Sequence, residues 1–247
     1  MRDLDKLVKN KEAIIRGKSK MFCLPFAGGG ASVFNGWIKA MKDQMTICPI
    51  QLPGREERIM EQPYIEMEDL VQDIVQAILP YMNDQVYIFG HSMGAKIAFE
   101  VEKELEKQGE KTNLLVISGS RVPHIPEPNP IYHLPDDEFE RELGRFEGTP
   151  KEIMESKELL AFFLPVLRAD FTLYEIYYSK DVFQLKCPIL ALGGENDREA
   201  DLEEIKSWGM YTDSDFRYRM FKGGHFFIRE SEDEVLDELK AAIRNLS

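Results

Sequence analysis

Cysteine is scarce in this chain, with three residues in 247, and none of them forms a C-x-x-C pair or a cluster with histidine. A disulfide framework needs an even, dense set of cysteines, and a structural zinc site needs four Cys or His ligands. Cys23, Cys48 and Cys187 each lie inside an apolar run. The sequence therefore predicts buried, reduced thiols in a cytoplasmic protein, with no disulfide framework, metal ion or other cofactor.

Long apolar runs and an excess of positive charge are also lacking. No stretch approaches the roughly 20 apolar residues of a membrane-spanning helix, and the start of the chain is too charged for a signal peptide. The chain has 31 basic and 44 acidic residues, a formal net charge of -13. Nucleic acids and anionic membranes bind proteins that present a basic face, so we expect neither as a partner. A monomer is the default expectation.

Apolar residues make up 43% of the chain, enough to bury the core of a single domain spanning residues 1–247. Short apolar runs, expected as strands, alternate with segments of helical periodicity. The expected strands are 20–26, 45–52, 85–90, 113–120, 187–194 and 216–221, and the expected helices lie near 31–43, 65–82, 92–108, 200–208 and 231–246. This alternation predicts an α/β fold, with a mostly parallel central sheet and helices on both faces.

Two helix ends carry sequence signals of their own. Gly109 follows the 92–108 helix, where glycine commonly caps a C-terminus. Ser231 and Glu234 have the spacing of a capping box, in which each side chain bonds the other residue's backbone amide. We therefore expect the last helix to begin at Ser231.

A helical insertion is expected at about 121–183, between two core strands. This segment holds seven of the thirteen prolines, and its later part, including 155–180, has helical periodicity. Neither flank resembles a flexible linker, so the insertion is predicted to be a lid on the single domain. Its aromatic residues could form the core of the lid or a wall of the substrate site.

The stretch Gly90-His91-Ser92-Met93-Gly94 has the G-x-S-x-G pattern of a nucleophile elbow, and it follows an expected strand and begins an expected helix. A strand that turns directly into a helix drives the serine toward positive φ and exposes its hydroxyl. Side chains two residues either side would crowd one another, which accounts for the glycines. The backbone N–H of Met93 could then stabilise an oxyanion. The alternative is a tight turn with an incidental serine.

A nucleophilic serine needs a base, and His225 is the candidate. It lies in the glycine loop of "FKGGHFFIRESED", between the last strand and the last helix, where the α/β-hydrolase order of Ser, Asp or Glu, then His places it. His91 adjoins Ser92 and is expected to have a structural role. His124 and His133 are expected at the surface of the insertion.

The acid is expected on the loop after the 187–194 strand, where Asp197 is the candidate. It would orient His225 and stabilise the imidazolium without taking the proton itself. Glu195 and Asp201 are alternatives on the same loop. No acid follows the 113–120 strand, where Arg121 comes next.

The glycine-rich turn "PFAGGGAS" at 25–32 follows the first strand and is expected to bring a second oxyanion donor, the N–H of Ala27, toward Ser92. The competing prediction is a phosphate-binding loop. The turn lacks the lysine of a P-loop and the spacing of a dinucleotide fingerprint.

Together these segments resemble the type II thioesterases that accompany nonribosomal peptide and polyketide synthetases. The resemblance covers the chain from about residue 20 and is carried by "FCLPFAGGGAS" (22–32), "QLPGREER" (51–58), "GHSMG" (90–94), "ALGGENDRE" (191–199) and "GGHFFI" (223–228). It implies an α/β-hydrolase fold with a mobile helical lid. It also implies an editing enzyme that removes acyl or aminoacyl groups from the phosphopantetheine arms of acyl or peptidyl carrier proteins.

The resemblance assigns Ser92 as nucleophile, Asp197 as acid and His225 as base, with Ala27 and Met93 as backbone oxyanion donors. The chain departs from the family after Asp197, where "READ" stands in place of the usual proline and apolar residues.

Other functions remain open. An acyl-CoA thioesterase or carboxylesterase would use the same triad, a non-catalytic binding protein could share the fold, and a chain-releasing synthetase domain is a further possibility. Because carrier proteins are generally acidic, docking to this acidic chain would need a local positive or apolar patch. Candidates for such a patch are Arg55, Arg58, Arg121 and Arg168.

Overall fold

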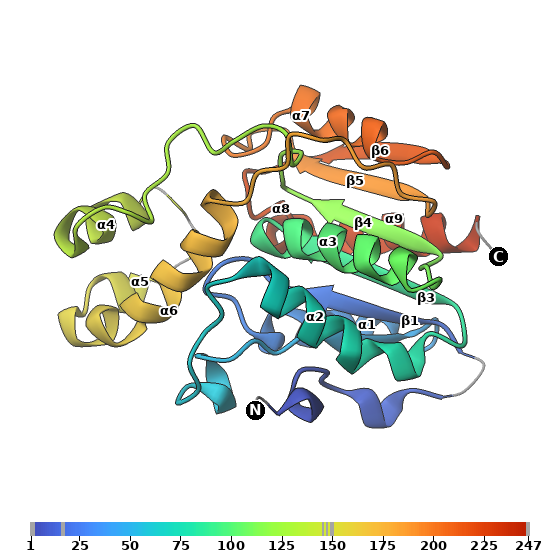
Figure 1. Ribbon diagram of the computed structural model, residues 1–247, viewed down its shortest axis with the longest axis horizontal. Coiled ribbons are helices and arrows are strands. Elements are labelled where there is room, and N and C mark those ends of the chain that lie inside the picture. The colour runs from blue at the N-terminus through green and yellow to red at the C-terminus, as the bar shows by residue number, and fades with distance from the viewer. Residues whose placement is uncertain (1–2, 16–17, 145, 147, 149–150, 246–247) are drawn as a thin grey trace.

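The computed structural model describes residues 3–15, 18–144, 146, 148 and 151–245. Its strands are β1 (Lys20–Leu24), β2 (Thr46–Pro49), β3 (Val86–His91), β4 (Leu114–Ser118), β5 (Ile189–Gly194) and β6 (Phe216–Phe221). They form one sheet in the order β2-β1-β3-β4-β5-β6 (Figure 1). All six predicted strands are present, and every pairing between them is parallel.

The strand register aligns the carboxyl ends of the central strands. Leu24 of β1 pairs with Gly90 of β3, and His91 of β3 pairs with Ser118 of β4. Gly194 of β5 pairs with Phe221 of β6. The loops that leave β1, β3, β5 and β6 therefore begin at the same edge of the sheet, where ligand sites of parallel α/β sheets occur.

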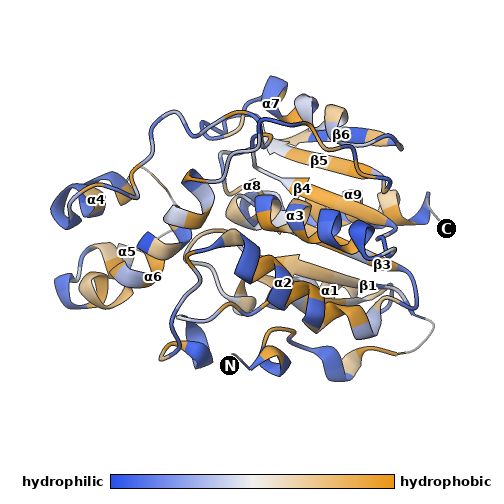
Figure 2. Cartoon of the chain, in the orientation of Figure 1, coloured by the Kyte–Doolittle hydropathy of each residue, from blue (hydrophilic) through white to orange (hydrophobic). Residues whose placement is uncertain are grey.

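Helices cover both faces of the sheet, as predicted. One face packs against α2 (Met67–Ile78), α3 (Met93–Lys107) and α7 (Leu202–Ser207), and the other against α1 (Asn35–Met41) and α9 (Glu232–Arg244). Side chains alternate between the two faces along each strand: in β1, Phe22 joins the first core and Cys23 the second. Figure 2 shows β4 and β5 largely in apolar colour between these helices, whereas β6 at the edge of the sheet is mixed.

Short helices extend this framework. The sequence did not predict α8 (Phe227–Glu230), which runs directly into α9. The 3-10 helices are Leu4–Lys6, Lys11–Ala13, Ala31–Phe34, Glu56–Arg58, Leu79–Tyr81 and Trp208–Tyr211.

One of the two predicted helix caps is confirmed and the other is wrong. Gly109 has φ +83°, and its amide and that of Glu110 bond the last-turn carbonyls of α3. The Ser231 hydroxyl instead bonds the Lys222 carbonyl at 3.0 Å, because α8 leads straight into α9 and leaves no extended residue before it. A capping box does occur at α7, between Asp201 and Glu204.

The segment between β4 and β5, residues 119–188, is called the β4–β5 insert below. It contains α4 (Asp136–Leu143), α5 (Lys151–Met154) and α6 (Lys157–Glu175), which project beyond the sheet (Figure 1). The helical content is as predicted, although α6 ends at Glu175 rather than near residue 180. The insert has its own small core of buried residues: Ile131, Phe139, Leu143, Leu160, Leu167 and Phe171. Its motion as a lid, within a single domain, stays a prediction.

All three cysteines are buried and unpaired, as the sequence predicts. Burial raises the pKa of the Cys23 and Cys187 thiols well above the ordinary value. In the part of the chain that the structure describes, every helix is too short or too polar to cross a membrane.

Candidate active site

Ser92 stands at the turn between β3 and α3 with φ 55° and ψ -118°. Positive φ is the strained state expected for an elbow, because a side chain at such a residue meets its own backbone. The Ser92 amide donates to the Ser118 carbonyl at 2.8 Å, which ties the elbow to β4. The turn therefore holds the serine in place at the carboxyl edge of the sheet.

The two elbow glycines are required by backbone contacts. A Cβ on Gly90 would lie 2.1 Å from the Gly94 carbonyl oxygen. A Cβ on Gly94 would lie 2.3 Å from the Leu24 carbonyl oxygen, at the end of β1. A side chain at either position would therefore clash with backbone. At residue 90 the clash is with Gly94, and at residue 94 it is with the end of β1.

Asp197 and His225 form a bonded pair beside the elbow. His225 Nδ1 lies 2.9 Å from Asp197 Oδ2, and the Asp197 side chain is fully buried. The other Asp197 oxygen accepts the Glu199 amide at 2.8 Å. A carboxylate accepts the Nδ1 proton, which leaves His225 Nε2 as an acceptor.

Ser92 and His225 line one cavity. No hydrogen bond joins the Ser92 hydroxyl to the imidazole among the contacts of the described residues. In hydrolases generally this bond is often loose without substrate and tightens in the complex. The three residues thus lie at one edge of the sheet, and their catalytic roles stay predictions.

The rival acids have other positions. Asp201 accepts the Glu204 amide at 2.9 Å as the N-cap of α7. Glu195 is exposed, and its amide bonds the Phe221 carbonyl on β6. Of the three acids, Asp197 is the one bonded to His225.

His91 is buried next to the Asp197–His225 pair. Its Nδ1 lies 2.9 Å from Ser118 Oγ, and its ring centre lies 5.1 Å from that of His225. Burial, then the nearby His225, lowers the pKa of His91 well below its usual value, so the ring is neutral at pH 7. The expected structural role agrees with this packing.

The two histidines of the insert differ from each other. His133 is exposed, as expected. His124 is half-buried and not a surface residue, because its ring stacks on Tyr211 and its Nδ1 bonds the Tyr211 hydroxyl at 2.8 Å.

The predicted oxyanion loop makes a tight turn over residues 26–29. The Gly29 amide donates to the Phe26 carbonyl at 2.9 Å, and Gly28 has φ +76°, the pattern of a turn that needs glycine in its third position. Ala27 lines the cavity with Ser92. Met93 begins α3 next to the serine. The role of the two amides as oxyanion donors stays a prediction.

A buried ion pair ties the β4–β5 insert to this turn. Asp170 of α6 accepts the Gly28 amide at 2.7 Å and forms a two-pronged pair with Arg55, with N–O distances of 2.6 and 2.8 Å. Arg55 also donates to the Gly29 carbonyl at 3.1 Å. Both side chains are almost fully buried. The position of α6 and the shape of the turn are therefore linked.

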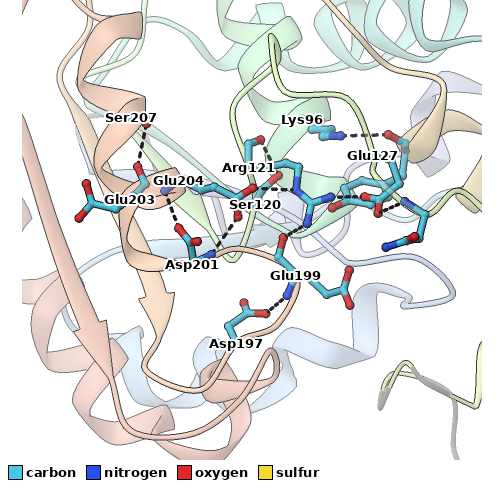
Figure 3. A network of polar contacts seen from close by, with 12 residues as sticks. Lys96, Ser120, Arg121, Glu127, Asp197, Glu199, Asp201, Glu203, Glu204 and Ser207 are labelled. Atoms are coloured by element: carbon cyan, nitrogen blue, oxygen red, sulfur yellow. Dashed lines mark hydrogen bonds and ion pairs between the residues drawn. The ribbon is translucent and has the colours of Figure 1, made fainter.

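A second network holds the loop that carries Asp197 (Figure 3). Arg121 bonds the Glu199 carbonyl and pairs with Glu127 at 2.6 Å and with Glu204 at 3.3 Å. The segment after β4 has the buried Arg121 where an acid could have been. Arg121 holds the loop that carries Asp197 through its bond to the Glu199 carbonyl.

The sequence did not predict that Asp170, Arg55 and Arg121 hold the loops around Ser92 in place. Asp170, a lone acid within the apolar stretch "LPVLRADFTLY", was the available signal. The arginines proposed as a docking patch have intramolecular partners instead. Arg55, Arg58 and Arg121 are buried, and Arg168 bonds the carbonyls of Tyr132 and Leu134.

Aromatic residues from the sheet edge and the insert enclose the cavity. Phe171 belongs to the core of the insert and also lines the cavity. It therefore combines the two roles expected for the aromatic residues of the insert, packing within the lid and forming a wall of the site. We call this cavity the chamber; its lining residues are Phe26, Ala27, Ser92, Phe146, Gly148, Phe171, Tyr174, Glu199, His225 and Phe226.

One group of side chains has the composition of a metal site, far from the chamber. Ligand atoms of Glu102, Glu106 and Cys187 lie within 4.8 Å of one another. Glu102 accepts the Thr112 amide at 3.0 Å, and Glu106 accepts the amides of Lys186 and Cys187. The two carboxylates therefore have a structural explanation, because each accepts hydrogen bonds from backbone amides of a loop.

Comparison with known proteins gives consistent matches. The thioesterase domain family model matches residues 19–243. A Brevibacillus parabrevis protein named linear gramicidin dehydrogenase LgrE is 36% identical over 230 residues, 91% of this chain and 88% of its own length. Thioesterase PikA5 of Streptomyces venezuelae is 33% identical over 222 residues, 89% of this chain and 79% of its own.

Solved structures agree with the family model. The type II thioesterase BorB from the borrelidin biosynthetic cluster superposes with a TM-score of 0.86 and 28% identity, covering 98% of both chains. The predicted α/β-hydrolase fold is thereby confirmed. The chain belongs to the thioesterase family, and it resembles type II thioesterases of biosynthetic clusters over nearly its whole length.

Proposed function

We propose that this protein is a serine hydrolase that cleaves acyl or aminoacyl thioesters from the phosphopantetheine arms of carrier proteins, as an editing enzyme of a nonribosomal peptide or polyketide synthetase. The observation that carries the proposal is the chamber shared by Ser92 and His225, with His225 bonded to Asp197 at 2.9 Å. The names of the relatives, which refer to gramicidin and borrelidin biosynthesis, support the substrate class.

In the proposed reaction, His225 Nε2 takes the proton of Ser92 as its hydroxyl oxygen attacks the thioester carbonyl. Asp197 keeps the Nδ1 proton in place and stabilises the imidazolium. The amides of Ala27 and Met93 donate to the oxyanion. The carbon–sulfur bond then breaks and the sulfur leaves as a thiolate, which is a good leaving group because the thiol pKa is about 8.5; it takes up the proton from the His225 imidazolium, which leaves the imidazole neutral. Water activated by His225 then cleaves the acyl-enzyme.

The partner is proposed to be an acyl or peptidyl carrier protein, met in the cytoplasm by a monomer of this chain. The competing functions are hydrolysis of acyl-CoA and of oxygen esters, and a non-catalytic binding role. The same arrangement of Ser92, His225 and Asp197 could hydrolyse a carrier-protein thioester, an acyl-CoA or an oxygen ester. Substrate preference therefore distinguishes these three reactions.

The test is a panel of acylated carrier proteins assayed for release of free thiol, beside the matching acyl-CoA and oxygen esters. We expect the carrier-bound thioesters to have the highest kcat/KM. A higher value for the oxygen ester would favour the carboxylesterase alternative, and no turnover of any substrate would favour the binding protein.

A further inference from the structure

Glu199 places a carboxylic acid in an otherwise largely aromatic wall. It lines the chamber together with Ser92, His225, Tyr174 and several phenylalanines. It also lines the adjoining cleft with Asn196, Arg198 and Gly224. Glu199 therefore stands where the chamber meets the cleft. A group bound beside Ser92 would be close to it.

The backbone amide and carbonyl of Glu199 are both hydrogen-bonded, whereas its carboxylate has no such partner among the described residues. Its amide donates to Asp197 at 2.8 Å, and its carbonyl accepts from Arg121. Figure 3 shows the side chain turned away from Arg121 and the carboxylate without a contact to any residue drawn. Among the described residues, no hydrogen bond or ion pair to this carboxylate is formed. The acid is thus held in place without an internal partner.

Two cations lie near Glu199 and neither bonds its carboxylate. Arg121 already pairs with the carboxylates of Glu127 and Glu204. Arg198 is exposed and lines the adjoining cleft, outside the chamber. Asp197 is bonded to His225. Partial burial, which removes some of the hydration of the carboxylate, and then the charge of Glu127 raise the pKa of Glu199. A cation placed beside it would relieve both the repulsion and the lost hydration.

The size of the chamber limits what this cation can be. The volume open to the centre of a water molecule is about 30 Å³, space for roughly two waters. A carbonyl carbon attacked by Ser92 would occupy part of it. Inside the chamber, only a cation bonded close to that carbonyl would fit, whereas a longer group would have to extend into the cleft that Glu199 also lines.

We infer that Glu199 binds the α-ammonium group of an aminoacyl thioester and makes this enzyme selective for aminoacyl over plain acyl groups. This inference rests on the proposed thioesterase function and names the substrate class of the same site. An uncharged acyl group would leave the Glu199 carboxylate unpaired in the complex.

The test compares alanyl and propionyl thioesters on one carrier protein, a pair that differs only in the ammonium group. Because that group also activates the carbonyl, the informative quantity is the change in the alanyl-to-propionyl ratio of kcat/KM on substitution. Glu199→Gln should lower this ratio about tenfold, the size expected for one charge-assisted hydrogen bond. The propionyl value is the reference within each variant, so a general loss of activity in Glu199→Gln cancels in the ratio.

The matched control is Glu195→Gln, on the same loop but exposed and outside the chamber. It should leave the ratio unchanged. An unchanged ratio in Glu199→Gln, or an equal loss for both substrates, would overturn the inference. A wild type that hydrolyses neither thioester would instead contradict the thioesterase function.

A measurement on the wild type covers the case in which Glu199→Gln does not fold. Alaninamide should inhibit propionyl-thioester hydrolysis at a concentration at least about tenfold below that of propionamide. N-acetylalaninamide, which has no charge, should behave like propionamide. Equal inhibition by all three would overturn the inference.

Discussion

Asp197 joins two parts of the chamber wall: one carboxylate oxygen lies 2.9 Å from His225 Nδ1, and the other accepts the Glu199 amide at 2.8 Å. Arg121 bonds the Glu199 carbonyl in turn. The orientation of the imidazole therefore depends on a loop anchored from β4. This chain of contacts holds the buried carboxylate against the imidazole.

Replacing Asp197 by Asn should lower kcat by up to about 10⁴, by analogy with other serine hydrolases, because an amide favours the wrong tautomer of His225. Thiol release from an acylated carrier protein measures the effect. Asp201→Ala is the control: it removes the N-cap of α7 and should cost about 1 kcal/mol of stability with little change in kcat. Similar kcat values for the two variants would contradict the assignment of Asp197.

Asp170→Asn should lower kcat at least about tenfold, since Gly28 loses a charged acceptor and the oxyanion turn loses its anchor on α6. Stability should also fall, by about 3–5 kcal/mol, because Arg55 is left unpaired in the interior. The control Asp136→Asn breaks an exposed pair with Arg168 on the same insert and should change neither quantity. Lower stability with unchanged kcat would show that the pair only holds the fold.

Gly90→Ala should destabilise the fold by at least about 3 kcal/mol or prevent folding, because the added methyl meets the backbone of α3 at 2.1 Å. Gly109→Ala is the matched substitution. That residue has φ +83° with nothing within 4 Å, so the cost should be only the 1–2 kcal/mol or so of a left-handed alanine. Urea unfolding gives both values. Equal costs would contradict the steric account of the elbow.

Glu102 should make stability fall as pH rises toward neutrality. Burial raises its pKa from 4.5 to about 7 in the fold. Because the folded-state pKa lies above the unfolded one, the fold favours the protonated acid, and stability is lost between about pH 4.5 and 7, by up to about 3 kcal/mol. Glu102→Gln removes this titration. Its free energy of unfolding relative to wild type should rise over that range and then level off, whereas parallel pH curves would contradict the burial argument.

The sequence predicts those parts of the fold that depend on short, contiguous patterns of residues. The five buried strands β1 to β5 are largely apolar, and the partly exposed β6 alternates arginine with aromatic or apolar residues, so all six could be predicted. The elbow at Ser92 has glycines at fixed spacing. The pairing of Asp170 with Arg55 joins residues 115 positions apart, and no local pattern encodes that partner. The Ser231 cap failed for a related reason, since the short helix α8 before it depends on tertiary packing.

The site itself was only partly predictable. Chain order and loop position identified His225 and Asp197 as candidates, and the pair is bonded in the structure. The charge environment of the acid loop was not predictable, because Arg121 and Glu199 meet only through folding. The aromatic residues of the insert could be placed in its core or in the chamber only from coordinates.

The most direct test of the account is whether Ser92 becomes covalently modified. A fluorophosphonate should add once per chain, and fragment mass spectra should place the adduct on Ser92. Ser92→Ala should take up no probe and release no thiol from acylated carrier protein, while its melting temperature stays near that of wild type. An adduct at another residue, or undiminished turnover in Ser92→Ala, would contradict the proposed mechanism.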